Sequence, residues 1–271
     1  MSRPVIVMAA PNGARKTYED HPALPATIAE TARAARSCME NGASMLHAHV
    51  RDDQLRHVLD AGLYSQLFDA VRTEAPGMLL QMTTEAVGIY SVEQQIDCVQ
   101  KVVPEYITMA LKEMAPDDES LPRAKQFYHW AFENSVHIQH ILFSAEEVSR
   151  FWTLHSSGIM PEENPCLLYV LGRYSKNFQS TAEDLNPFLD IEATQRHTWF
   201  VCAFGHSEFD CAMAAVNAGG HARIGFENNL YKKDGSLAKD NADNIAQLTL
   251  AIRQAGNIVA TPEITKELLR N

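Results

Sequence analysis

Eight short apolar runs recur along the chain, and segments with helical periodicity separate them. The runs are residues 5–10, 44–50, 78–84, 106–111, 136–143, 166–172, 198–204 and 221–226. The helical segments are residues 27–41, 61–75, 91–102, 120–134, 145–158, 207–218 and 240–255. The pattern is least clear at residues 173–197. Apolar strands that alternate with helices predict a parallel sheet covered by helices.

The clearest of these helices is the one at residues 27–41. Thr27 and Glu30 have the spacing of a capping box, and Gly42 stands where a left-handed residue commonly ends a helix. One predicted face carries Ile28, Ala32, Ala35 and Met39.

Eight strand–helix units favour a closed (β/α)8 TIM barrel of the α/β class. A doubly wound nucleotide-binding sheet fits the sequence less well, because the chain lacks a glycine-rich nucleotide fingerprint. We find no linker or low-complexity segment, so residues 1–271 are predicted to form one domain. In such barrels the functional residues lie at the carboxyl ends of the strands and on the loops that follow them.

Composition restricts the partners of this chain. The 46% apolar content is typical of a folded domain, and the formal net charge of −11 argues against nucleic acid or an anionic membrane as the main partner. Five cysteines without a Cys-x-x-Cys pair predict reduced thiols. No run has the length of a signal peptide core or a spanning helix. We therefore expect a soluble cytoplasmic protein.

Two histidines stand in the stretch "MLHAHVRDD", residues 45–53. Residues i and i+2 of a strand point to the same side, so His47 and His49 are expected to project together into the barrel mouth. A metal ion would satisfy the ring nitrogens of both, and zinc binds neutral imidazole readily. A pair of hydrogen-bonded structural histidines is the alternative, and this motif alone does not decide between them.

Glu227 is the best candidate for a third ligand. It follows the last predicted strand, which in a closed barrel lies beside the first strand and near the second. A catalytic zinc usually has three protein ligands and one open position. A solvated loop glutamate is the alternative interpretation.

Other polar residues lie near the predicted barrel mouth. Arg223, inside the last predicted strand, would either pair with a neighbouring carboxylate or hold a substrate oxyanion. Hydroxyl, acidic and imidazole candidates are Thr83, Thr84, Glu85, Thr108 and His206, although the threonines are also ordinary strand formers. Candidate anion-binding residues are Arg15, Lys16, Arg173 and Lys176, for which surface charge is the alternative.

Several stretches, in their order and spacing, resemble the β-keto acid cleavage enzymes. They are "AAPNGA", "GASMLHAHVRD", "QMTTEAVG", "YVLG", "TWFVCAFG", "GGHARIGFENNLY" and "ATPEITKELL". Each is weak alone, but the ordered set is specific and extends over nearly the whole chain.

This resemblance implies a (β/α)8 barrel, usually a homotetramer, with one catalytic Zn2+ per chain. It implies a reaction in which a β-keto acid and acetyl-CoA yield acetoacetate and a new acyl-CoA. The family's metal ligands fall on His47, His49 and Glu227. Its strand arginine falls on Arg223, and its substrate-binding hydroxyls fall on Thr83 and Thr108.

Two departures from the lysine-fermentation member of the family change the expected chemistry. Asn228 replaces the aspartate assigned there as general base, and an amide is not a useful proton acceptor. Glu85 and His206 are our candidates for a replacement. Arg15 stands where that member has a glutamate that binds an ammonium group, which predicts an anionic β-keto acid.

Two other functions remain open from the sequence. A barrel-type zinc hydrolase would need further ligands, for which His140 and His206 are the candidates, and an aspartate after the last strand, where Asn228 and Asn229 stand instead. A non-catalytic ligand-binding barrel, without a base at Asn228, is the second alternative.

Overall fold

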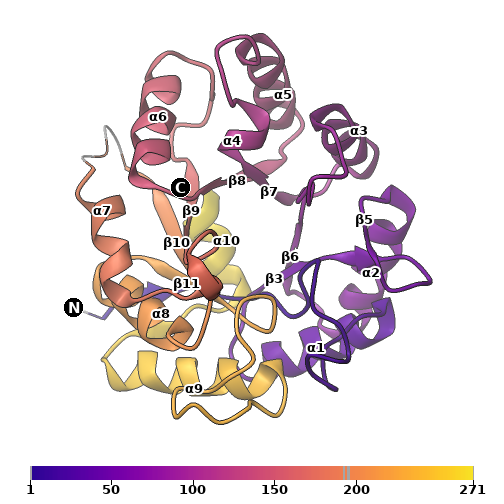
Figure 1. Cartoon of the computed structure of the whole chain (residues 1–271), viewed down its shortest axis with the longest axis vertical. Helices are drawn as coiled ribbons and strands as arrows, with labels where there is room; N and C mark the ends of the chain where they lie inside the picture. The colour runs from indigo at the N-terminus through magenta and orange to yellow at the C-terminus, as the bar shows by residue number, and fades with distance from the viewer. Residues whose placement is uncertain (1, 192, 194–195, 271) are drawn as a thin grey trace.

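The computed structural model describes residues 2–191, 193 and 196–270 (Figure 1). Within them, parallel strands close into a barrel, and helices surround it. The barrel strands are β2 (Val7–Ala9), β3 (Met45–Ala48), β6 (Leu79–Met82), β7 (Tyr106–Ala110), β8 (His137–Leu142), β9 (Cys166–Leu171), β10 (Thr198–Ala203) and β11 (His221–Ile224). Each corresponds to one of the predicted runs, so the predicted (β/α)8 barrel is confirmed.

The barrel closes between β11 and β2, with Arg223 opposite Met8. β2 in turn pairs with β3, with Met8 opposite Met45. The last barrel strand is therefore two positions away from the strand that carries His47. This is the arrangement that the prediction of a shared site requires.

The helices around the barrel also follow the predicted segments. They are α1 (Ile28–Glu40), α2 (Ala61–Glu74), α3 (Val92–Val102), α5 (Leu121–Glu133), α6 (Ala145–Ser156), α8 (Glu208–Asn217) and α9 (Asn241–Gln254). The capping box of Thr27 and Glu30 is present at the start of α1, and Gly42 adopts a φ of +105° just after its end.

The segment without a clear pattern, residues 173–197, forms only short elements where the structure describes it. They are the 3-10 turns η1 (Lys176–Phe178) and η2 (Ala182–Leu185) and the single-turn helix α7 (Asn186–Leu189). Turns of this length have no room for an amphipathic repeat, which explains the weak periodicity. A further short helix, α4 (Leu111–Met114), follows β7 directly.

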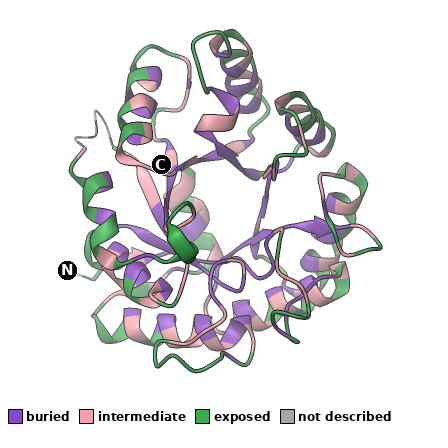
Figure 2. Cartoon of the chain, in the orientation of Figure 1, coloured by how far each residue is buried: buried purple, intermediate pink, exposed green. Residues whose placement is uncertain are grey.

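Alternate strand residues divide the core into two layers. One layer lies between the strands and the helices, and the other fills the barrel interior with side chains that include Ile6, Met8, Met45 and Phe200. Figure 2 shows the strands buried and the outer helix faces exposed. Helix α10 (Pro262–Arg270) packs Ile264, Leu268 and Leu269 against the inner layer at the amino ends of the strands.

Two small strand pairs lie outside the barrel. β1 (Pro4–Val5) pairs with β12 (Ile258–Val259), and β4 (Val50–Arg51) pairs antiparallel with β5 (His57–Val58). The β4–β5 hairpin turns the chain back toward the barrel mouth immediately after His49. None of the described helices combines the length and apolarity that a membrane span requires.

Candidate metal centre

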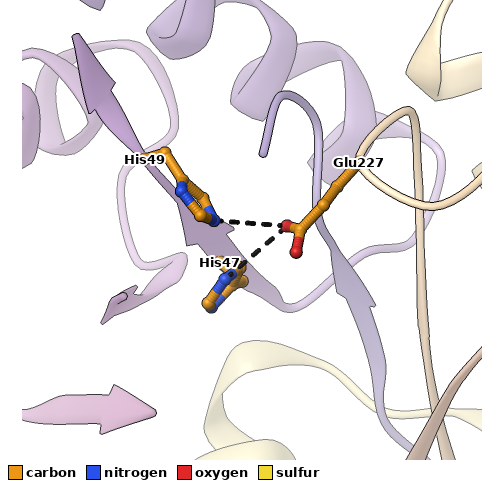
Figure 3. A group of neighbouring side chains, drawn as sticks. All are labelled: His47, His49 and Glu227. Atoms are coloured by element: carbon orange, nitrogen blue, oxygen red, sulfur yellow. Dashed lines mark ion pairs between the residues drawn. The ribbon is translucent and has the colours of Figure 1, made fainter. Parts of the chain in front are cut away.

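Three side chains from two distant parts of the sequence meet at the barrel mouth. One nitrogen each of His47 and His49 and one carboxylate oxygen of Glu227 lie within 4.8 Å of one another. Oε2 of Glu227 is 3.6 Å from Nε2 of His47 and 3.5 Å from Nε2 of His49 (Figure 3). The sequence predicted this trio, and the structure brings its members together.

The side chain of Asn12 holds the backbone of His49. Its Nδ2 donates to the carbonyl of His49 at 2.9 Å, and its Oδ1 accepts from the amide of His49 at 3.1 Å. Both ends of the amide are thus used on one residue. This clamp continues the pairing of β2 and β3 beyond the ends of the strands and fixes the depth of His49 in the mouth.

Glu227 is held from both sides of its backbone. Its amide donates to the carbonyl of Ala10 at 3.1 Å, and its carbonyl accepts from Nζ of Lys16 at 2.7 Å. Gly13, with a φ of +60°, approaches so closely that an added Cβ would lie 2.6 Å from Cγ of Glu227. Gly225 lets the chain pass Ala10 in the same way, because a Cβ there would collide with the carbonyl oxygen of Ala10.

Arg223 pairs with the third candidate ligand. Its Nη2 donates to Oε1 of Glu227, and both side chains are almost fully buried. Burial would raise the pKa of the Glu227 carboxyl, but the charge of the Arg223 guanidinium beside it holds that pKa well below its usual range. The sequence left two roles open for Arg223, and the structure shows the first of them, pairing with a neighbouring carboxylate. Nε of Arg223 is buried without a hydrogen-bond partner in the described chain, so one donor remains for a substrate.

The donor set fits a divalent cation. Burial, followed by the charge of Arg223, lowers the pKa of His47 well below its usual value, so this imidazole is neutral near pH 7. Nε2 of His49 and Oε2 of Glu227 are buried and have no hydrogen-bond partner among the described residues. Leaving such atoms unpaired is unfavourable. A cation between them would satisfy both, and two neutral imidazoles with one carboxylate form a common zinc donor set.

Two cavities adjoin these side chains. The larger, of about 320 Å³, is lined by residues that include Asn12, Arg15, Lys16 and Tyr231. The smaller, of about 60 Å³, reaches His47, Thr83 and Arg223. Both cavities share Glu85, Arg173, Phe204 and Glu227. Glu227 therefore borders both spaces in which a ligand could bind.

The predicted hydroxyl residues are buried near this space. Thr83 lines the smaller cavity, and its Oγ1 accepts from the amide of Glu85 at 3.1 Å. Thr84 donates to the carbonyl of Thr108 at 2.7 Å. Oγ1 of Thr108 is buried and has no hydrogen-bond partner in the described part of the chain. An unpaired hydroxyl of this kind is suited to a ligand but does not identify one.

The acidic and imidazole candidates differ in their positions. Glu85 is half-buried, with Oε2 3.9 Å from Nδ1 of His49 and Oε1 3.2 Å from Nη2 of Arg173. His206 is exposed at the rim of the larger cavity, where its ring lies 4.2 Å from that of Tyr231. Glu85 therefore lies beside a candidate ligand, whereas His206 lies at the cavity rim.

Asn228 is fixed by a glutamate that the sequence did not single out. Its Nδ2 donates to Oε1 of Glu208 at 3.1 Å, and that oxygen also accepts from the amide of Gly225 at 3.0 Å. Glu208 begins helix α8 and is buried. Burial raises the pKa of its carboxyl to about 8, although the bonds from Gly225 and Asn228 act in the opposite direction.

The predicted cations have different surroundings. Arg15 is exposed and lines the larger cavity. Lys16 is bonded to the Glu227 carbonyl, and Arg173 is bonded to Glu85. Lys176 is exposed on η1. Arg15 is thus the predicted cation that lines the mouth and is exposed there.

Sequence reasoning missed two residues behind the histidines. Oε1 of Gln81 lies 2.8 Å from Nδ1 of His47, and Nδ1 of His57 lies 3.3 Å from Nδ1 of His49. Burial lowers the pKa of His57 to about 3. An isolated polar residue in an apolar run was a signal for Gln81. For His57 the signal was weaker, because its position depends on the turn of the hairpin.

His140, a ligand candidate under the hydrolase hypothesis, faces away from the barrel interior. Its ring centroid lies 5.3 Å from that of Tyr128 on α5 and 4.9 Å from that of Phe151 on α6. It therefore packs in the helical layer, and the hydrolase hypothesis loses this ligand.

Comparisons with known proteins agree on one family. A family model described as beta-keto acid cleavage enzyme matches residues 4–270. A 3-keto-5-aminohexanoate cleavage enzyme of Fusobacterium nucleatum subsp. nucleatum is 29% identical over 278 residues, covering 99% of this chain and 98% of that protein. A 3-oxoadipate:acetyl-CoA acetyltransferase of Cupriavidus necator is 23% identical, covering 99% and 95% respectively.

A similar fold occurs in the solved apo structure of ObcA. It superimposes with a TM-score of 0.72 at 13% sequence identity, covering 92% of this chain and 65% of the ObcA chain. At this identity the likeness concerns the barrel fold alone.

Proposed function

The chain belongs to the β-keto acid cleavage enzyme family, and we propose that it is a zinc-dependent acyltransferase acting on a β-keto acid and acetyl-CoA. The products would be acetoacetate and a new acyl-CoA. The observation that carries this proposal is the convergence of His47, His49 and Glu227, with buried donor atoms left unpaired beside two cavities. The name of the Cupriavidus necator relative supports acetyl-CoA as the cosubstrate.

The proposed cofactor is one Zn2+ per chain, held by His47, His49 and Glu227. When bound, it would neutralise the substrate carboxylate and polarise the neighbouring ketone, which acidifies the carbon between them.

The chain's own residues would bind and orient the reactants. Arg223 already neutralises one oxygen of Glu227, and its free Nε is available to an oxyanion of the substrate. Thr83 and Thr108 are proposed to hold the β-keto acid through their hydroxyl groups. Electrostatic stabilisation by such fixed donors typically lowers the activation free energy by about 3 kcal/mol.

Glu85 is our first candidate for the general base, and His206 is the second. The base would remove one proton from the carbon between ketone and carboxylate. That carbon would attack the acetyl carbonyl, with CoA thiolate as the leaving group. The thiolate would then attack the carbonyl carbon of the original ketone. Cleavage of the bond from that carbon to the central carbon would give the new acyl-CoA. The central carbon would take back the proton, and its fragment would leave as acetoacetate.

We propose an anionic tail for the β-keto acid, because Arg15 is exposed at the larger cavity.

The proposed setting is the cytoplasm, and the proposed assembly is a homotetramer. Light scattering of the purified protein tests the assembly separately from the chemistry.

The decisive experiment incubates zinc-loaded protein with acetyl-CoA and β-keto acids whose tails are anionic, neutral or cationic, and then assays acetoacetate. We expect acetoacetate and the matching acyl-CoA to form in equal amounts, most rapidly with an anionic tail. The matched control is the His47→Ala, His49→Ala variant, which should form neither product. Zinc binding without turnover of any substrate would instead favour a non-catalytic ligand-binding barrel.

A further inference from the structure

A third buried histidine lies directly behind His49. His57 is on β5, and the β4–β5 hairpin folds it back toward the barrel. Its ring centroid is 5.0 Å from that of His49, and the two Nδ1 atoms are 3.3 Å apart. His57 is only 6% exposed. It does not belong to the cluster of candidate ligands, and the proposed reaction does not use it.

The other nitrogen of His57 determines where its proton lies. Nε2 is 2.8 Å from the backbone carbonyl oxygen of Glu85, and a carbonyl oxygen only accepts hydrogen bonds. Nε2 of His57 therefore carries a hydrogen. A second proton, on Nδ1, would make His57 a buried cation, which burial disfavours. Nδ1 of His57 consequently presents a lone pair to His49.

We propose that His57 is a positioning residue that holds His49 in its Nδ1-protonated tautomer, so that the Nε2 lone pair of His49 faces Glu227. This inference rests on the proposed function, which places a metal ion at that point. His49 donates from Nδ1–H to Nδ1 of His57, and His57 donates from Nε2–H to the backbone carbonyl of Glu85. Residues of this kind fix the orientation of a metal-binding histidine.

The neighbouring ligand has the same arrangement with a different side chain. Nε2 of Gln81 donates to Oε1 of Gln139 at 3.2 Å, which leaves Oε1 of Gln81 to accept from Nδ1 of His47. Both imidazoles thus have a neutral acceptor at Nδ1 and direct Nε2 to the same carboxylate oxygen. The agreement between two unrelated side chains argues that the acceptor behind His49 is part of the site.

The hairpin that carries His57 is itself fastened to the loop after β2. Arg51, on β4, donates to the carbonyls of Gly13 and Lys16, each at 2.8 Å. The same loop holds the backbone of Glu227 through Lys16. His57 is therefore fixed relative to both His49 and Glu227, as a positioning role requires.

The first test measures the affinity of purified protein for Zn2+ and Co2+ alone, by competition with a chelator. Replacing a positioning residue of a metal site typically weakens binding by about 10–100-fold, and we expect this loss in His57→Leu. His57→Gln should restore most of the affinity, because the amide can accept from His49 and donate to Glu85. His140→Leu, which removes an equally buried histidine from the helical layer, should bind as the wild type does.

Unchanged affinity in His57→Leu, or an equal loss in His57→Gln, would overturn the inference while leaving the proposed function intact. Failure of the wild type to bind either cation would overturn both.

A second measurement uses the wild type alone, so it does not depend on whether a substituted chain folds. Long-range ¹H–¹⁵N NMR of the metal-free wild type distinguishes the two neutral histidine tautomers. We expect the Nδ1-protonated form for His49 and the Nε2-protonated form for His57. An Nε2-protonated His49 would contradict the proposal.

Discussion

Nε2 of His49 and Oε2 of Glu227 lie 3.5 Å apart, and neither has a hydrogen-bond partner among the described residues. Both atoms are buried, so their desolvation is not compensated within the protein. The backbones that carry them are fixed by Asn12 and Lys16 respectively. Two unpaired atoms held this firmly indicate a preformed site for a cation.

Metal content should depend on His47 and His49. We expect about one zinc ion per wild-type chain, as the proposed donor set of three ligands predicts, and almost none in the His47→Ala, His49→Ala variant. Elemental analysis after dialysis measures both. His140→Leu is the control for loss of a buried histidine. Full metal content in the double variant would refute the site.

Removing Arg223 should destabilise the metal-free protein. Arg223→Met leaves the Glu227 carboxylate buried without its cation, and breaking a buried pair in this way costs about 3–5 kcal/mol. Bound zinc would replace part of the lost charge, so the deficit should shrink in the loaded protein. Urea unfolding with and without zinc measures both effects.

The control for this change is Arg72→Met, which breaks an exposed pair with Asp69 and should cost at most about 1 kcal/mol. An equal deficit for Arg223→Met in loaded and metal-free protein would show that zinc does not lie beside Glu227.

The barrel was predictable because its determinants are local. Buried parallel strands read as apolar runs, and helices such as α1 carry their own caps. The segment at residues 173–197 was not predictable: where the structure describes it, its turns are too short for an amphipathic repeat, and tertiary contacts hold them, such as the hydrogen bond from Oγ of Ser180 to the carbonyl of Phe204 at 2.7 Å.

The site was predictable only in part, because some of its contacts depend on tertiary structure. The i, i+2 spacing placed His47 and His49 together, and strand order brought Glu227 near them. The partner behind His49, unlike Gln81 on β6, depends on how the chain turns. His57 reaches His49 through a hairpin in which Leu55 adopts a φ of +62°, a conformation that no sequence pattern indicated.

Substrate preference should follow the charge at position 15. Arg15→Glu should reverse the ranking of β-keto acids, favouring cationic over anionic tails, because the side chain is exposed at the larger cavity. The measurement is kcat/KM for a matched pair of substrates. Lys176→Glu makes the same charge change on η1 and serves as control. An unchanged ranking in Arg15→Glu would remove the argument for an anionic substrate.

Loss of the general base should lower kcat. We expect Glu85→Gln to reduce it by about 100-fold or more, a typical contribution of a positioned base, while retaining zinc. His206→Asn should have the smaller effect, because His206 is exposed at the rim of the larger cavity. Steady-state kinetics with zinc-loaded enzyme measures both values of kcat. If both variants keep wild-type rates, neither residue is the base.

Stability should depend on pH through Glu208. The ordinary carboxyl pKa is 4.5, and burial raises the pKa of Glu208 to about 8. Above pH 4.5 the unfolded chain loses this proton, whereas the folded protein keeps it until the pH approaches 8. The contribution of Glu208 to the free energy of unfolding is therefore largest below pH 4.5. It decreases as the pH rises from 4.5 to about 8, by about 1.4 kcal/mol per pH unit at most.

Glu208→Gln should abolish this fall, because the amide is neutral at every pH and can still accept from Gly225 and Asn228. The variant should gain stability relative to the wild type as the pH rises through this range. Urea unfolding of metal-free protein across these pH values measures the difference, and Glu119→Gln, at an exposed position, is the control. Parallel pH profiles for wild type and Glu208→Gln would mean that Glu208 is ionised in the folded protein, with Lys16 as the nearby cation that stabilises it.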